Sequence, residues 1–208
     1  MKFCSRIIQY VLGLLILAFG VAFSANSGLG ISPVNALPYV LSLVLKVELG
    51  MCVTGVFLLY TFLQILILRR DFQLINLTQI LFSTLFGFFV DFAKAVLGSF
   101  SIPTYAGQLV MLAISIVLVA TGISLYVDAA LVNMPMEGLV SAIVAKQNKY
   151  AFHQIKVIVD CIVVLLAAIL SLAALHDLQG VREGTLLCAL LVGKIMPLIR
   201  EKLLCRFK

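Results

Sequence analysis

The sequence predicts an all-α polytopic membrane protein, in which six transmembrane helices form two inverted three-helix repeats, each with a re-entrant or broken half-helix. Three observations support this fold class: the apolar composition, a set of long apolar stretches, and an internal repeat. Of the 208 residues, 63% are hydrophobic and only 12% are charged. An ordinary soluble domain is about 45–50% apolar and about 25% charged, and a fold of this size exposes too much surface to hide such an excess. The composition therefore excludes a soluble enzyme and a disordered chain.

Charge and motifs exclude further functions. The net charge of +6 comes from Lys and Arg residues that are scattered between apolar runs. Because they form no single basic face, we expect no binding to nucleic acid. The five cysteines lack the spacing of a metal site or a disulfide framework, and the sequence has no nucleotide-binding loop or nucleophile–base motif. We therefore expect no enzymatic activity, no metal and no cofactor.

Apolar stretches long enough to cross a bilayer occur six times. About 20 apolar residues form one spanning helix, and the stretches of this length are 7–25, 50–68, 77–100, 107–127, 154–175 and 184–203. Two further segments, 28–47 and 130–146, are shorter and interrupted. Each has a proline near its start, Pro33 or Pro135, followed two positions later by Asn35 or Glu137. Since proline is tolerated in the first turn of a helix, both segments are predicted to be half-helices that begin at the prolines.

The distribution of basic residues predicts the orientation. If both short segments enter and leave on one side, ten Lys and Arg residues lie inside and two outside, with both termini cytoplasmic. If both segments cross fully, nine lie inside and three outside, which is almost the same bias. Because segment 130–146 is too short for a full span, we predict that the short segments are re-entrant. The ten inside residues are Lys2, Arg6, Arg69, Arg70, Lys146, Lys149, Arg200, Lys202, Arg206 and Lys208.

An internal repeat relates residues 1–100 to residues 101–208, within one integral membrane domain. A shift of 102 positions aligns Gly20 with Gly122, Pro33 with Pro135, and Asn35 with Glu137 without a gap. Each half then consists of a helix, a short segment and two further helices. Three crossings are an odd number, so the two halves face opposite ways in the membrane. Inverted repeats with broken helices are typical of secondary transporters, with the substrate near the midplane.

Four segments carry a resemblance to a known family. GLGISPVNALPYVL, its partner VNMPMEGLVSAIVAK, the later KVIVD and the final GTLLCALLVGK together resemble the YczE/YyaS/YitT family of bacterial integral membrane proteins. The resemblance spans nearly the whole chain and implies a multi-pass protein of the bacterial cytoplasmic membrane, similar in outline to small transporters. Members often carry Trp after the first-half proline, where this chain has Val34.

Charged residues inside the apolar segments are the main candidate site residues, because charges in hydrocarbon are usually paired or functional. They are Asp91, Lys94, Glu137, Lys156, Asp160 and Lys194. Asp91 with Lys94 and Lys156 with Asp160 have the spacing of local pairs on one helix face. Lys194 lies near the middle of its stretch and needs an acidic partner, for which Glu137 and Asp160 are the candidates. The alternatives for Lys194 are a structural ion pair and a substrate-anion or proton-coupling site.

These features predict a secondary transporter of a small solute, an anion or an amphipathic compound, coupled to a proton or ion gradient. The half-helix N-termini at Pro33 and Pro135 carry partial positive charge that suits an anionic group. We expect them to meet near the midplane, with Asn35 and Glu137 beside a shared polar cavity. The candidate substrate and coupling residues are Asn35, Glu137, Asp160, Lys194 and Asp91, with Glu137 or Asp160 as the proton carrier.

The alternative function is a non-transporting membrane subunit that assembles with or regulates another membrane complex. Its intramembrane charges would pair with residues of the other subunit. The expected partners of the chain are the lipid bilayer and a small-molecule substrate, and a homodimer stays open as an alternative.

Overall fold

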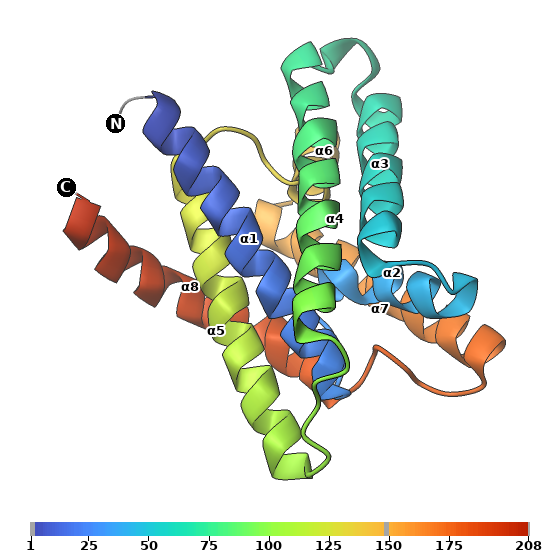
Figure 1. Ribbon diagram of the computed structural model, residues 1–208. Coiled ribbons are helices and arrows are strands. Elements are labelled where there is room, and N and C mark those ends of the chain that lie inside the picture. The colour runs from blue at the N-terminus through green and yellow to red at the C-terminus, as the bar shows by residue number, and fades with distance from the viewer. Residues whose placement is uncertain (1–2, 148–149, 208) are drawn as a thin grey trace.

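The described part of the chain consists of α-helices joined by short connections (Figure 1). The computed structural model describes residues 3–147 and 150–207. Its α-helices are α1 (Phe3–Ser27), α2 (Pro33–Leu45), α3 (Leu49–Leu68), α4 (Thr78–Leu97), α5 (Tyr105–Ala129), α6 (Pro135–Gln147), α7 (Phe152–Leu175) and α8 (Glu183–Phe207). Two short 3-10 turns, Arg69–Asp71 and Leu74–Leu77, lie in the α3–α4 connection.

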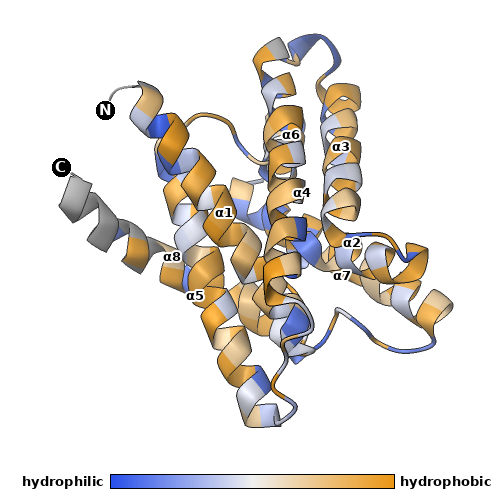
Figure 2. Ribbon diagram, in the orientation of Figure 1, coloured by the Kyte–Doolittle hydropathy of each residue, from blue (hydrophilic) through white to orange (hydrophobic). Residues whose placement is uncertain are grey.

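Five helices, α1, α3, α4, α5 and α7, are long and apolar enough to cross a membrane, and hydrophobic residues cover most of their length (Figure 2). They coincide with five of the six predicted spans. The sixth predicted span falls on α8, which has 25 residues but does not belong to this set. Its charged residues are Glu183, Lys194, Arg200, Glu201, Lys202 and Arg206. The chain is therefore a multi-pass α-helical membrane protein, and within the described residues five helices meet both requirements.

Two short helices stand at the positions of the predicted half-helices. α2 begins at Pro33 and α6 at Pro135, and each has 13 residues. At a rise of about 1.5 Å per residue, such a helix is about 20 Å long, whereas the hydrocarbon core of a bilayer is about 30 Å thick. In the connection before α2, Gly28 and Gly30 have φ angles of 70° and 107°, which glycine adopts without steric cost. The chain therefore turns sharply before it enters the half-helix.

The first helices of the two halves, α1 and α5, pack against each other along most of their length (Figure 1). A Cβ atom added at Gly13 would lie 2.9 Å from the carbonyl oxygen of Gly122, so the two backbones touch there. One end of this contact is fixed by Ser115, whose Oγ donates to the carbonyl oxygen of Gly20 at 2.7 Å. At the other end, Arg6 Nε donates to the Ala129 carbonyl oxygen at 2.8 Å. The two helices are therefore antiparallel, and small residues permit their close approach.

The remaining helices surround this pair. α2 packs against α7, α3 against α6, α4 against α1, and α8 against α5. α3 also packs closely against α4, because Gly50 and Gly87 face each other with no room for a side chain on either. Nothing lies within 4 Å of a Cβ added at Gly193 of α8, so α8 makes no equivalent close contact there.

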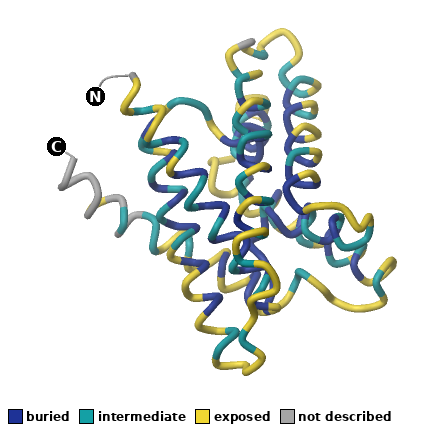
Figure 3. The backbone as a smooth tube through the Cα atoms, in the orientation of Figure 1, coloured by how far each residue is buried: buried dark blue, intermediate teal, exposed yellow. Residues whose placement is uncertain are grey.

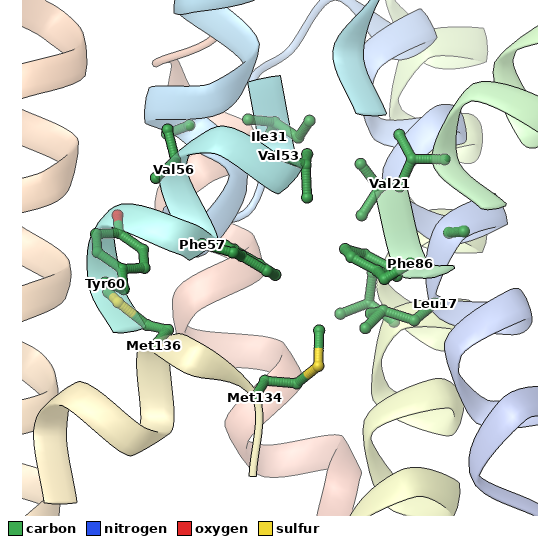
Figure 4. Close-up of a cluster of buried hydrophobic side chains, with 14 of the residues drawn as sticks. Leu17, Val21, Ile31, Val53, Val56, Phe57, Tyr60, Phe86, Met134 and Met136 are labelled. Carbon is green, nitrogen blue, oxygen red and sulfur yellow. The ribbon is translucent and has the colours of Figure 1, made fainter. Parts of the chain in front are cut away.

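A continuous apolar cluster fills the middle of the bundle, where most buried residues lie (Figure 3). The rings of Phe57 and Phe86 stack in it with centroids 6.0 Å apart. Ile31, just before α2, and Met134, just before α6, belong to the same cluster and lie on either side of the two phenylalanines in Figure 4. Large apolar side chains on the outer faces of the helices are exposed, as expected for surfaces that contact lipid.

Candidate functional site

The two short helices, α2 and α6, carry a polar side chain at the same position, the third residue of each helix. Asn35 is 4% exposed, and its Nδ2 donates to Ser32 Oγ at 3.1 Å. Three buried side-chain oxygens of the described residues have no hydrogen-bond partner, and they are Asn35 Oδ1, the Tyr60 hydroxyl and Glu137 Oε2. Buried polar atoms nearly always have a partner in native proteins. Asn35 Oδ1 and Glu137 Oε2 lie at equivalent positions of the sequence repeat. Each can therefore accept a hydrogen bond from a ligand or a water molecule, and the Glu137 carboxylate can also bind a proton.

Two tyrosines from the central helix pair surround the start of α6. Tyr126 of α5 donates from its hydroxyl to Glu137 Oε1 at 3.5 Å, a long contact. Tyr10 of α1 donates to the carbonyl oxygen of Val132 at 3.1 Å, in the segment that leads into α6. The two rings meet edge to face at 5.8 Å. The tyrosines therefore hold both the entering segment and the carboxyl group of the half-helix.

Two glutamines fix the first turn of α6 from the other side. Gln64 of α3 donates from Nε2 to Pro135 O at 2.9 Å and to Gln79 Oε1 at 3.1 Å. Both glutamine side chains belong to residues that are almost fully buried. Gly138 lies against Gln64, where an added Cβ would come within 2.6 Å of the Gln64 Oε1 atom. Glycine at this position therefore lets α6 approach α3 closely enough for the hydrogen bond to Pro135.

The predicted ion pair between Lys156 and Asp160 is present on α7. Lys156 Nζ lies 2.7 Å from each carboxylate oxygen of Asp160. The two side chains are 24% and 22% exposed. Both groups interact electrostatically with Glu137 of the neighbouring α6. The site thus combines two carboxyl groups with one ammonium group.

The second predicted local pair, Asp91 with Lys94, is not formed. Asp91 Oδ1 instead accepts a hydrogen bond from the backbone N–H of Gly50, in the first turn of α3. Lys94 Nζ donates to Asn26 Oδ1 at 2.8 Å, at the end of α1. Both side chains therefore join α4 to other helices, because the close α3–α4 and α1–α4 packing offers each a better-placed partner than the other. Asp91 acts as a structural cap in this arrangement.

Lys194 does not contact the acidic residues that the sequence suggested. It is exposed, and the ion pairs that the described residues form do not include it. The physical reason is the position of α8, which packs mainly against α5, whereas Glu137 and Asp160 lie on α6 and α7. The pairing of Lys194 with Glu137 or Asp160, predicted for at least one state, is therefore not formed in this conformation.

Two cavities lie at opposite ends of the antiparallel α1–α5 pair. The α1-end cavity, of about 200 Å³, lies between the end of α1 and the α7–α8 connection and is lined by Ser24, Ala25, Gly28, Gly30, Ile31, Tyr39, Asp177, Leu178, Gln179, Gly180 and Arg182. The α5-end cavity, of about 280 Å³, lies between the end of α5 and the α3–α4 connection and is lined by Ile75, Asn76, Gln79, Tyr126, Val127, Ala130, Leu131, Val132 and Asn133. Neither is the shared cavity beside Asn35 and Glu137 that the sequence suggested. The apolar cluster around Phe57 and Phe86 occupies the middle instead.

The chemistry of these surfaces does not favour an anion. Glu137 itself occupies the first turn of α6, so a carboxyl group of the chain already matches the positive end of that helix. The α5-end cavity has amide and hydroxyl groups but no charged side chain in its lining. In the α1-end cavity, the cation Arg182 is accompanied by the anion Asp177. Both cavities suit a small solute that forms hydrogen bonds and carries no net charge.

Comparison with known proteins identifies the family of the chain. Residues 4–201 match DUF6198, a family of unknown function. The chain belongs to the DUF6198 family. It is also similar to the uncharacterized membrane protein YczE of Bacillus subtilis (strain 168), with 32% identity over 145 residues, which are 66% of this chain and 62% of YczE. The chain therefore spans less than two thirds of the length of this curated relative. No solved structure matches the chain.

The similarity to YczE confirms the family resemblance that the half-helix motifs indicated. Three polar residues that contact α6 or the segment before it were not predicted from the sequence, namely Tyr10, Gln64 and Tyr126. Uncharged polar side chains are not unusual in apolar helices, so nothing singled them out. The available signal was the occurrence of a tyrosine or an amide within a stretch predicted to span, where its polar atoms need a partner. Their convergence on α6 depends on helix packing, which their spacing in the sequence does not give.

Proposed function

We propose that this DUF6198 chain is a secondary transporter, which moves a small solute across the bacterial cytoplasmic membrane in exchange or symport with protons. The observation that carries this proposal is the pair of unpartnered, buried oxygens, Asn35 Oδ1 and Glu137 Oε2, at equivalent positions of two half-helices. An amide at one position can bind a solute. A carboxyl group at the other can also gain and lose a proton.

The helix contacts support an inverted repeat as the framework of transport. Exchanging the two halves turns the α2–α7 contact into the α6–α3 contact, and the α1–α4 contact into the α5–α8 contact. The α1–α5 contact is its own counterpart. A pseudo-two-fold axis in the membrane plane, as in many transporters, relates contacts in this way. In this arrangement α8 is the sixth span, the counterpart of α4.

The two cavities are also counterparts under the repeat. A shift of 102 positions carries five residues that line the α1-end cavity onto five that line the α5-end cavity: Ser24 onto Tyr126, Ala25 onto Val127, Gly28 onto Ala130, Gly30 onto Val132, and Ile31 onto Asn133. We interpret the cavities as the two entrances of an alternating-access pathway. The apolar cluster between them closes the pathway in this conformation.

The contacts of α6 support re-entry of segment 130–147. It begins beside the end of α5, and its last turn carries Lys146, whose Nζ lies 3.3 Å from Asp71 Oδ2 in the α3–α4 connection. That connection also borders the α5-end cavity together with the end of α5, so both ends of the segment belong to one face. Arg6, Arg69 and Arg70 belong to the same face, which predicts that it is cytoplasmic. Of the other basic residues used to predict orientation, Lys2, Lys149 and Lys208 lie outside the described residues.

Reconstitution tests the proposed function. Solutes that raise the thermal stability of the purified protein are then offered to proteoliposomes with a pH gradient across the membrane. We expect the wild-type protein to accumulate at least one such solute as long as the gradient lasts. Glu137→Gln should fold and still exchange labelled for unlabelled solute, but it should lose the gradient-driven accumulation, because Gln keeps the shape and loses the proton. Accumulation by Glu137→Gln equal to that of the wild type would remove Glu137 from the coupling step.

One observation favours the alternative of a membrane subunit. Lys194 is exposed on α8, one turn after the exposed side chains of Leu190 and Leu191, and an ammonium group in contact with hydrocarbon is costly. An acidic residue of another membrane protein would stabilise it. Crosslinking from a photoreactive residue at position 194 in native membranes tests this alternative, and a single heterologous product would support it.

A further inference from the structure

Glu137 lies between two different environments. On one side is the α5-end cavity, which Tyr126 lines. On the other side is α7 with the Lys156–Asp160 ion pair. Tyr126 is 3% exposed, and its hydroxyl contacts Glu137 Oε1 at 3.5 Å. The same side chain therefore borders the cavity and contacts the carboxyl group.

We infer that Tyr126 is the gate through which Glu137 exchanges its proton, and that in the conformation described here this exchange takes place with the α5-end face only. The inference rests on the proposed function, because a coupled transporter must keep its proton site open to one side at a time. In the exchange step, the proton of the Glu137 carboxyl passes to a water molecule in the cavity and leaves a carboxylate. The Tyr126 hydroxyl keeps its proton and donates a hydrogen bond to the carboxylate.

The surroundings of Glu137 make the α5-end route the open one. The groups that face it from the helices around α6 are Tyr10, Tyr126, Lys156 and Asp160, with the neutral Gln64 beside the same turn. Lys156 is paired with Asp160 at 2.7 Å. Its ammonium group stabilises a carboxylate nearby but, having no acceptor, cannot take the proton of Glu137. Towards the α1-end cavity, the apolar cluster around Phe57 and Phe86 separates Glu137 from water.

The geometry of Tyr126 suits a gate. A contact of 3.5 Å is long for a hydrogen bond between oxygens, and such bonds are usually 2.5–3.0 Å. A small rotation of the side chain therefore breaks it at little cost. The Tyr10 ring packs edge to face against Tyr126, and Tyr126 also lines the cavity, which offers room for that movement.

Carbodiimide labelling tests the gate without any knowledge of the solute. A protonated carboxyl group adds to a carbodiimide to give an acylurea, and mass spectrometry of the peptide that contains position 137 measures the product. A water-soluble carbodiimide is added to right-side-out and to inside-out vesicles that contain the full-length protein. Glu137→Gln identifies the signal of this carboxyl. A lipid-soluble carbodiimide, which arrives through the bilayer, measures labelling that does not depend on the cavity.

We expect slow labelling of Glu137 by the water-soluble reagent in the wild type. Tyr126→Ala should raise the rate about tenfold or more, which corresponds to about 1.4 kcal/mol of barrier, and only when the reagent is on the α5-end face. Tyr39→Ala is the matched control, because Tyr39 lines the α1-end cavity; this change should leave the rate unaltered. Tyr126→Leu, which retains more volume, serves if Tyr126→Ala does not fold.

Labelling of Glu137 that is unchanged in both Tyr126 variants, or equally fast from the two faces, would overturn the inference. So would acceleration by Tyr39→Ala. The result is separable from the proposed function. Labelling from one face only, together with an absence of solute transport, would support the gate and contradict the transporter. Gradient-driven transport with equal labelling from both faces would support the transporter and contradict the gate.

Discussion

Polar groups inside the bundle have few partners, so single residues have large effects on stability. Lys156 and Asp160 satisfy each other on α7 at 2.7 Å. Replacing Lys156 by Met leaves two carboxyl groups, those of Asp160 and Glu137, without a neighbouring cation. Charges left alone in a partly buried site cost about 1–3 kcal/mol.

We therefore expect Lys156→Met to lower the thermal stability of the detergent-solubilised protein, and the double change Lys156→Met with Asp160→Leu to recover part of the loss. Removing both members of a pair avoids the unpaired charge. Lys46→Met, at an exposed lysine with no ion pair among those formed by the described residues, is the control and should have little effect. If the double variant were less stable than Lys156→Met, Asp160 would have another essential partner.

Close helix contacts are the main feature at the scale of elements, and they depend on glycine. A Cβ atom added at Gly122 would lie 2.7 Å from the Gly13 carbonyl oxygen and 2.7 Å from the Leu17 backbone nitrogen. Because both are backbone atoms of α1, the helices must move apart to admit it. At Gly55 of α3, by contrast, an added Cβ meets nothing within 4 Å.

Gly122→Ala should accordingly destabilise the protein by about 1–3 kcal/mol, the usual range for overpacking a tight contact. Gly55→Ala should be neutral or slightly stabilising, since alanine favours helix more than glycine by about 1 kcal/mol. Thermal unfolding of the two variants in the same detergent compares the effects. Equal stabilities would mean that the α1–α5 contact is looser than described.

Local patterns in the sequence predicted the elements well. The apolar stretches gave five spans, and the prolines marked the first residue of α2 and of α6. The Lys156–Asp160 pair followed from spacing on one helix. The contact of Asp91 with Gly50 and the lack of an ion pair of Lys194 among the described residues did not follow from spacing, because both depend on which helices become neighbours. The length and hydropathy of a helix do not determine which helices it contacts. The internal repeat alone did not determine the position of α8 either.

For the whole molecule, the central feature is that each half supplies one short helix that begins at a proline, and that two cavities lined by both halves lie at opposite ends of the α1–α5 pair. Exchange of the halves preserves most helix contacts, so two conformations with the roles of the halves exchanged should have similar energies. A protein with two such conformations can be shifted between them by a proton on Glu137, provided that the proton binds one conformation more tightly. The α3–α4 contact has no counterpart of similar extent between the described parts of α7 and α8.

Proton-driven alternating access is tested most directly by measuring how accessible each of the two cavities is at different pH values. Single cysteines replace Asn133 in the α5-end cavity or Gln179 in the α1-end cavity, in a variant without the native cysteines, and a charged maleimide reports their reaction rates in acidic and in alkaline buffer. Alternating access predicts that the change of pH raises the rate at one position and lowers it at the other, and that Glu137→Gln abolishes both changes. Rates that move in the same direction at the two positions, or that respond equally with and without Glu137, would contradict proton-driven alternating access.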